Sequence, residues 1–179
     1  CDVIVCDLNY CFDPRVYLKR YFDHGRQINT FLIDEAHNLN DRLRSMYSAG
    51  LSRSEILDIQ RIFREVNPGL SKALIRVNRI FSRLKSQCRE NESLALVLDD
   101  IPDKLLPELR AFAGKADHWL VKHQEDSDIR TGLLDLYFKA NIFLTIAGYW
   151  ETNYRFYLEL PDEHEVMVKL YCLDPSPIF

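Results

Sequence analysis

The sequence predicts a mainly α-helical fold, in which an antiparallel helical bundle is inserted into an incomplete α/β domain. Three long segments between residues 68 and 150 repeat apolar residues every three or four positions, as bundle helices require. The chain before them contains two apolar runs typical of buried parallel strands, and the chain after them alternates with a two-residue period. The order is therefore sheet, bundle, sheet.

The composition is that of a folded protein. The chain has 179 residues, of which 47% are hydrophobic and 12% aromatic, and this argues against disorder. The net charge of −4 does not by itself indicate a nucleic-acid-binding protein, so local charge matters more. No apolar run reaches the length of a membrane span and no leader is visible, so we expect a cytoplasmic protein with no membrane partner. Because the chain opens at Cys1 inside an apolar run and not at Met, we expect a fragment of a longer protein.

The cysteines do not predict a zinc site. No CxxC pair occurs among them, and no histidine lies at zinc-finger spacing. Their odd number fits reduced thiols, and we expect Cys6 and Cys172 to be small core residues. The five cysteines are Cys1, Cys6, Cys11, Cys88 and Cys172.

The N-terminal part of the chain predicts a strand, a short helix and a second strand. Residues 3–6 form the first apolar run, and residues 28–34 form the second. Between them, Asp13 and Pro14 supply an N-cap and a first-turn proline, and Gly25 ends the helix. This order implies a right-handed parallel crossover.

The chain then becomes helical. A helix is expected over residues 37–48, broken by Ala49 and Gly50, and Ser52 with Glu55 forms a capping box for the next helix. The residues expected to face inward from that helix are Ile56, Ile59, Phe63 and Val66.

Three bundle helices are predicted over residues 68–90, 103–124 and 128–150. Their apolar seams contain Leu70, Leu74, Val77, Phe81, Leu84 and Cys88; Leu105, Leu109, Phe112, Ala116 and Trp119; and Ile129, Leu133, Leu136, Ala140, Phe143, Ala147 and Trp150. Core packing explains these aromatic residues without any cofactor.

The C-terminal part predicts two strands. Tyr154, Phe156 and Leu158 alternate with polar residues, a turn follows at residues 161–164, and residues 166–173 run back. We therefore divide the chain into residues 1–50 and 151–179, which belong to one α/β domain, and residues 51–150, which are a helical insertion.

The candidate catalytic residues follow the second apolar run. Asp34 and Glu35 come directly after it, at the strand end where open α/β sheets place their ligands. In a nucleoside triphosphatase one carboxylate holds Mg²⁺ and a second orients the attacking water. The alternative is a pair of acids that only caps the next helix.

Two blocks in this region resemble a known family. Asp34-Glu35-Ala36-His37 is the DEAH form of the Walker B box of superfamily 2 helicases. The segment CDVIVCDLNYCFDPRV, followed by FLIDEAHNLNDRLR, is similar to the iron-sulfur helicases of the XPD/DinG type. The closing VKLYCLDP resembles the strand that leads to motif III of these helicases.

The resemblance implies an arch domain inserted into the first RecA-like motor domain of an ATP-dependent helicase that moves 5′ to 3′ on single-stranded DNA, in repair or replication. ATP and Mg²⁺ would be its cofactors, with a 4Fe-4S cluster outside this fragment. Asp34 would place the Mg²⁺, Glu35 would polarise water, and His37 would link nucleotide state to motion. The implied partners are single-stranded DNA, ATP and the remaining helicase domains of the same chain.

A phosphate-binding loop is missing from the sequence. The only Gly-Lys pair, Gly114-Lys115, lies inside a predicted helix and lacks the spacing of a Walker A box. Neither Cys1 nor Cys6 matches the setting of the family's cluster cysteines. We therefore expect the fragment alone to be inactive as an ATPase and to hold no cluster.

A basic stripe is the candidate DNA contact. Lys72, Arg76, Arg79 and Arg83 recur at helical spacing opposite the apolar seam of their helix. Such a stripe can bind phosphates without sequence preference, or it can simply be a solvated helix face. The acidic residues Asp99, Asp100 and Asp103 could pair with part of it.

A different class of function competes with the helicase. The chain could be a helical protein-interaction module with an incidental DEAH sequence. A Walker A box and four clustered cysteines upstream in the parent reading frame would decide for the helicase.

Overall fold

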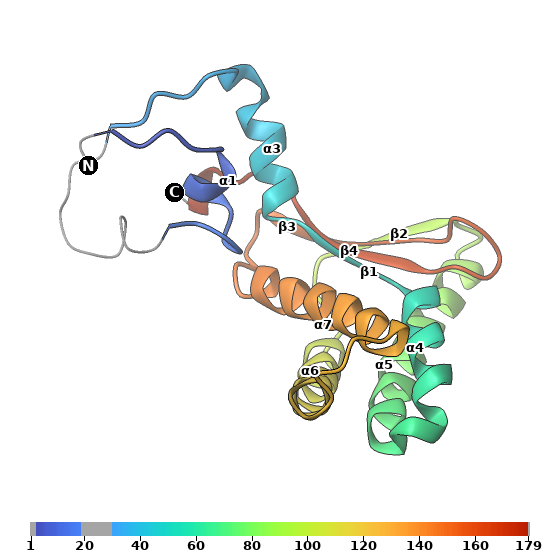
Figure 1. Ribbon diagram of the computed structural model, residues 1–179. Coiled ribbons are helices and arrows are strands. Elements are labelled where there is room, and N and C mark those ends of the chain that lie inside the picture. The colour runs from blue at the N-terminus through green and yellow to red at the C-terminus, as the bar shows by residue number, and fades with distance from the viewer. Residues whose placement is uncertain (1–2, 19–29, 179) are drawn as a thin grey trace.

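The computed structural model describes residues 3–18 and 30–178, and these residues are mainly helical with one small antiparallel sheet (Figure 1). The helical elements are α1 (Asn9–Phe12), the 3₁₀ helix η1 (Ala36–Asn38), α3 (Leu39–Met46), α4 (Arg53–Val66), α5 (Pro68–Glu90), α6 (Leu105–Lys122), α7 (Asp128–Ala147) and the 3₁₀ helix η2 (Ser176–Ile178). The strands are β1 (Ala49–Ser52), β2 (Ala95–Leu98), β3 (Tyr154–Glu159) and β4 (Met167–Cys172). The predicted mainly α fold is confirmed at this level.

The sheet has the strand order β1-β4-β3-β2, and every neighbouring pair is antiparallel. Leu170 of β4 lies opposite both Ala49 of β1 and Phe156 of β3. The long helices α4 to α7 lie on one side of this sheet (Figure 1). Side chains alternate along β3 and β4 between that helix-covered side, where they are buried, and the outer side.

The helical seams form the core as predicted. Every residue predicted for the seams of α5 and α6 is buried, and so are Leu133, Leu136, Ala140 and Phe143 of α7. Four of the predicted residues differ: Ile129 is 37% exposed and Val66 is 49% exposed, and Ala147 and Trp150 are only partly buried. All four lie at or beyond a helix end: Ile129 is in the first turn of α7, Ala147 is its last residue and Trp150 lies beyond it, and Val66 is the last residue of α4.

The predicted strands near the N-terminus are wrong within the described residues. Residues 3–6 and 30–33 form no sheet, and Val5 and Leu32 are 94% and 97% exposed. A strand is held by hydrogen bonds to a neighbour, and no described strand lies beside either segment. The expectation that Cys6 is a core residue is also wrong, since it is exposed, whereas Cys172 is buried as expected.

The helix predicted to start at Asp13 and Pro14 is not present in the described part of that region. Instead α1 ends at Phe12 and a turn follows over residues 14–16. The Asp13 carboxylate accepts a hydrogen bond from the backbone N–H of Arg15 at 2.9 Å, which stabilises the turn in place of an N-cap. The predicted helix end at Gly25 lies outside the described residues, as do residues 28 and 29 of the second predicted strand.

Two of the four strands were not predicted from the sequence. β1 begins at Ala49, where the sequence indicated only a helix break, and β2 lies in a connection between two predicted bundle helices. Each has four residues, too few to show a clear alternation, and each forms because β4 or β3 offers a free edge. One continuous core links the bundle to the sheet, and the domain division at residues 50 and 150 stays a prediction.

The N-terminus of α4 is capped by a residue distant in sequence. Ser52 occupies the N-cap position, but its side chain makes no capping hydrogen bond, so the predicted capping box is wrong. Instead Glu165 Oε1 accepts hydrogen bonds from the backbone N–H groups of Arg53 at 3.0 Å and Ser54 at 3.2 Å. Glu165 Oε2 accepts a hydrogen bond from the Ser52 hydroxyl at 3.0 Å. The carboxylate therefore joins the start of α4 to the chain just before β4.

This cap makes stability depend on pH. Burial alone would raise the pKa of Glu165, but hydrogen bonds from Ser54, Val166 and Ser52 outweigh it and hold the pKa below its ordinary value of 4.5. Because the folded-state pKa is depressed, the cap stabilises the fold above pH 4.5 and is lost as pH falls through the folded pKa.

We expect Glu165→Gln to lower the free energy of unfolding at pH 7 by about 1 kcal/mol. The difference from wild type should shrink below pH 4.5, as measured by thermal unfolding at several pH values. A Glu163→Gln control, on the same exposed turn, should behave as wild type. A pH-independent difference for Glu165→Gln would contradict the capping role.

Candidate functional site: the acid pair and the basic helix

The acid pair lies in a turn after residues 30–33. Glu35 adopts a left-handed backbone conformation with φ 51°, which is uncommon for a residue with a side chain. The Asp34 carboxylate accepts a hydrogen bond from the Glu35 backbone N–H at 2.8 Å and holds this turn. η1 and α3 follow directly, so the two acids lie where the chain turns into a helix.

The structure brings Glu35 and His37 together. His37 Nε2 lies 3.3 Å from Glu35 Oε2, and the two side chains are 72% and 68% exposed. A carboxylate next to an imidazole can orient a water molecule and accept a proton from it, which is the chemistry expected of Glu35. The three predicted catalytic residues thus lie within one exposed turn.

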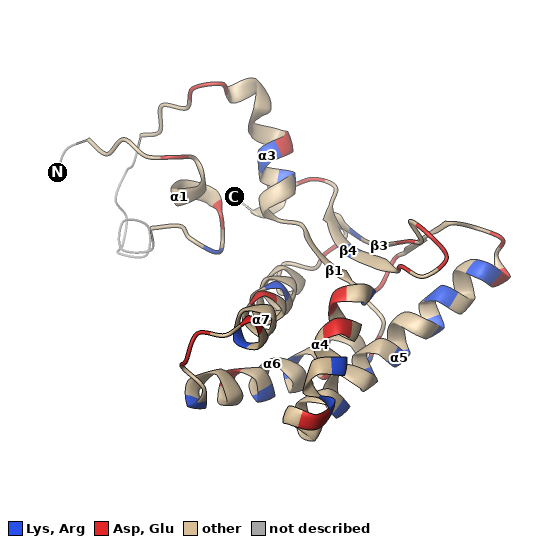
Figure 2. Cartoon of the chain, turned by 45° about the vertical axis from the view of Figure 1, so that its right-hand side comes forward, with Lys and Arg blue, Asp and Glu red and all other residues tan. Residues whose placement is uncertain are grey.

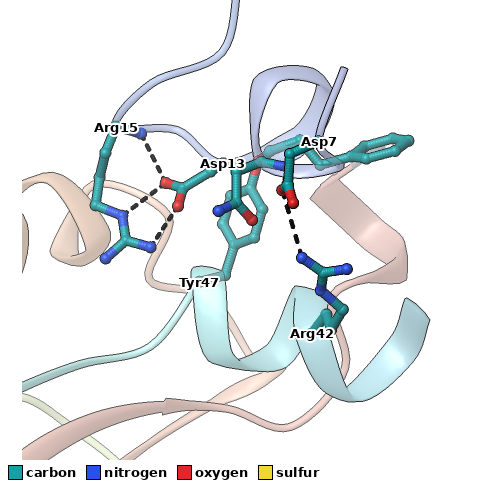
Figure 3. A network of polar contacts seen from close by, with 7 residues as sticks. Asp7, Asp13, Arg15, Arg42 and Tyr47 are labelled. Carbon is teal, nitrogen blue, oxygen red and sulfur yellow. Dashed lines mark hydrogen bonds and ion pairs between the residues drawn. The ribbon is translucent and has the colours of Figure 1, made fainter. Parts of the chain in front are cut away.

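The helix that follows the acid pair is tied to the N-terminal segment. Figure 3 shows Arg42 of α3 directed at Asp7, with Nη2 3.4 Å from the carboxylate oxygen. At the end of the helix, the Tyr47 hydroxyl donates a hydrogen bond to the carbonyl of Phe12 at 2.9 Å. Burial and the nearby Tyr149 and other ionisable groups raise the pKa of Tyr47 to about 12, so it stays a neutral donor. Asp7 and Arg42 lie inside the two blocks that resemble the helicases, but no pattern in the sequence predicts that they pair.

The same helix is also tied to the sheet. The backbone N–H of Cys172 in β4 donates to the Ser48 hydroxyl at 3.0 Å, and Arg44 Nε donates to the carbonyl of Leu173 at 2.9 Å. The rings of Tyr47 and Tyr149 meet edge to face, with centroids 5.2 Å apart. α3 therefore connects the acid pair to both the sheet and the end of α7.

Asp13 is a buried carboxylate in this junction, with 2% of its surface exposed. Arg15 pairs with it through Nε at 2.6 Å and through Nη2 (Figure 3). The hydrogen bond to Asp13 raises the pKa of the Arg15 guanidinium. This pairing makes Asp13 a structural residue of the turn.

The acid pair fits Mg²⁺, whereas the described cysteines do not fit an iron-sulfur cluster. The exposed Asp34 carboxylate is the kind of hard oxygen ligand that Mg²⁺ uses when phosphates and water complete its shell. In the described part of the chain no group of three or more metal-binding side chains occurs. The sulfurs of Cys6 and Cys11 are 3.8 Å apart, but Cys88 and Cys172 are buried elsewhere, so these four cysteines do not fit a cluster.

Three of the four residues of the predicted basic stripe lie exposed on α5. Lys72, Arg79 and Arg83 are exposed, and none forms an ion pair with another described residue. Arg76 differs, because its Nε lies 2.6 Å from the Glu108 carboxylate of α6 and it is less exposed. Figure 2 shows Lys and Arg positions, coloured blue, at several places along α5. We use "basic stripe" below for Lys72, Arg79 and Arg83.

The nearby acids do not neutralise the basic stripe. Asp99 pairs with Arg155 of β3, at 3.4 Å. Asp100 and Asp103 form no ion pair with the stripe among the described residues. The Gly114-Lys115 pair lies inside α6, as the sequence indicated, and does not form a phosphate-binding loop.

None of the helices in residues 3–18 and 30–178 is both long and apolar enough to cross a membrane.

A family model matches the N-terminal third of the chain. Residues 1–56 match the family model DEAD_2, so this segment is similar to DEAD/DEAH helicases. The matched segment contains the acid pair, α3, β1 and the first residues of α4. No curated protein matches the chain.

Proposed function

We propose that this chain is the DEAH-box and arch-like portion of an ATP-dependent DNA helicase of the XPD/DinG type. The observation that carries the proposal is the similarity of residues 1–56 to the DEAD_2 family, over the segment that contains the acid pair. The whole protein would hydrolyse ATP to move 5′ to 3′ on single-stranded DNA in repair or replication. Residues 51–150 would be its arch-like insertion.

The acid pair has distinct roles in this proposal. Asp34 would hold Mg²⁺, which when bound neutralises charge on the phosphates of ATP. Glu35 would orient and polarise the attacking water, and its contact with His37 supports a shared proton network. α3 would carry the state of this site to the sheet through Arg44 and Ser48.

The phosphate-binding and cluster-binding parts of the helicase would come from its other domains in the same chain. The phosphate-binding loop and the 4Fe-4S cluster would lie there, since the described cysteines do not fit a cluster. The 179-residue chain would therefore not hydrolyse ATP by itself.

The bundle would supply a contact to the DNA backbone. Three cations on one exposed helix face, which form no ion pair among residues 3–18 and 30–178, can bind phosphates of a single strand without reading its sequence. Arg76 would contribute less, because its charge is already compensated by Glu108. The proposed DNA contact therefore keeps three of the four basic residues that the sequence indicated.

The test is binding of the 179-residue chain to fluorescent single-stranded DNA, measured by anisotropy across a salt series. Changing Lys72, Arg79 and Arg83 together to Glu should weaken binding at low salt at least about tenfold and lower the salt slope by about 2. A matched variant, with Arg110, Lys115 and Lys122 of α6 changed to Glu, has the same net charge as the basic-stripe variant. It should bind the DNA much more tightly than the basic-stripe variant does. Equal loss in both variants would mean that total charge, and not the basic stripe, determines binding.

A further inference from the structure

The outer side of the sheet holds a hollow of about 400 Å³. Arg155, Tyr157, Lys169 and Tyr171, which line it, occupy the less buried positions of β3 and β4. These positions face away from the long helices, which lie on the other side of the sheet (Figure 1), so the hollow is no part of the bundle core. The residues that line it come from all four strands and the end of β4. They are Gly50, Val97, Arg155, Tyr157, Glu159, Met167, Val168, Lys169, Tyr171 and Leu173.

Two tyrosines and two cations alternate at the centre of this outer side. Tyr157 of β3 lies directly opposite Lys169 of β4, and Arg155 lies directly opposite Tyr171. Each tyrosine therefore has a cation as its cross-strand neighbour, and the two tyrosines are diagonal neighbours. The Lys169 ammonium lies over the Tyr171 ring, 5.0 Å from its centroid, so a base can stack on that face only when a phosphate draws the lysine aside. We refer to these four residues as the outer platform.

The outer platform differs from an ordinary solvated sheet face. Tyr171 is 38% exposed, and the apolar side chains beside the platform, Val97 and Met167, are 58% and 41% exposed. One exposed ring and one half-buried ring, Tyr171 and Tyr157, with cations beside them match single-stranded nucleic acid, whose bases stack on aromatic rings while its phosphates bind Lys and Arg. A lysine at the centre counts against a protein-docking face, because interface cores are depleted of lysine.

We propose that the outer platform binds single-stranded nucleic acid, with bases stacked on Tyr157 and Tyr171 and phosphates held by Lys169 and Arg155. This inference takes the class of ligand, single-stranded nucleic acid, from the proposed function. It does not depend on the basic stripe, because the outer platform lies on the sheet and the stripe lies on α5. It adds a base-stacking site to a chain whose other candidate contact is to phosphates alone.

Two acids contact residues of the outer platform. Asp99, which is 89% exposed, lies 3.4 Å from Arg155 and competes with a phosphate for it. Glu159 accepts a hydrogen bond from the Tyr157 hydroxyl at 2.9 Å, which holds the ring in place. Asp99→Asn should therefore tighten binding a few-fold, because it removes the carboxylate that competes with a phosphate for Arg155.

The test uses the 179-residue chain, a fluorescent oligo-dT and an oligonucleotide of equal length made of abasic sites. Tyr157→Ala and Tyr171→Ala should each weaken oligo-dT binding about tenfold without changing the salt slope, whereas the Phe variants should keep most of the affinity. The abasic strand should bind wild type and both Ala variants equally weakly. Circular dichroism checks that each variant is folded.

The outcomes separate the two surfaces. If the Ala variants bind oligo-dT as wild type does while the basic-stripe variant has lost binding, the platform proposal is overturned and the stripe stands. If the tyrosine variants lose affinity and the basic-stripe variant does not, the platform stands and the stripe fails. No binding of wild type at low salt overturns both, and the platform would then be a face for a protein partner.

Discussion

Replacing Glu35 by Gln in the complete protein is expected to lower the rate of ATP hydrolysis by about 10²- to 10⁴-fold, the usual contribution of a general base. The amide keeps the size of the side chain and its exposed position, but it cannot accept a proton from the attacking water. ATP binding should persist, because the proposed Mg²⁺ ligand is the neighbouring Asp34. The measurement is steady-state phosphate release with single-stranded DNA present, together with nucleotide binding at equilibrium.

The matched control for this variant is Asp41→Asn. Asp41 is an exposed acid on α3, 3.5 Å from Arg44, and has no place in the proposed chemistry. It should hydrolyse ATP at nearly the wild-type rate. If the Glu35 variant were as active as wild type, the acid pair would be an ordinary helix-start feature and its catalytic assignment would be wrong.

Replacing Phe81 by Ala is expected to lower the free energy of unfolding by about 3–5 kcal/mol. Phe81 is fully buried in the seam of α5, within the core that joins the bundle to the sheet. The loss combines the free energy of transferring the ring from water into the core with the cost of the cavity that the ring leaves behind. Urea unfolding of the 179-residue chain, followed by circular dichroism, measures the change.

Phe138 provides the comparison for Phe81. It also lies in a bundle helix, but it is 53% exposed, so Phe138→Ala should cost less than about 1 kcal/mol. Similar losses in the two variants would show that the buried seam does not hold the bundle together.

The bundle helices were predictable because each carries its own signal. The seam of α5 repeats over 23 residues, and both of its ends match the prediction. Asn67 also caps this helix locally, since its side chain accepts a hydrogen bond from the Leu70 N–H at 3.1 Å. Helix periodicity is a property of neighbouring residues, so the sequence alone reveals it, whereas the caps predicted at Asp13 and Ser52 were wrong.

Features that depend on distant partners were not predictable. β1 exists because of its pairing with β4, and the cap of α4 comes from Glu165, more than 100 residues away. The predicted strands at residues 3–6 and 30–33 failed for the complementary reason, because a buried-strand composition does not supply a neighbouring strand.

The candidate site shows the same division. The tetrapeptide 34–37 predicted the acid pair and its histidine, and the structure places Glu35 and His37 in contact. The sequence also placed Arg76 in the basic stripe, but its pairing with Glu108 depends on how α5 packs on α6. Tyr157 and Tyr171 became a candidate surface only once the register of β3 and β4 was known.

Strand displacement by the complete protein tests the central claim most directly. The substrates are two short duplexes, one with a 5′ single-stranded tail and one with a 3′ tail, incubated with ATP and Mg²⁺. The proposal predicts displacement of the duplex with the 5′ tail only, and none by the Glu35→Gln variant. Displacement of neither duplex, with no ATP hydrolysis stimulated by single-stranded DNA, would contradict it and would favour a helical interaction module that carries an incidental DEAH sequence.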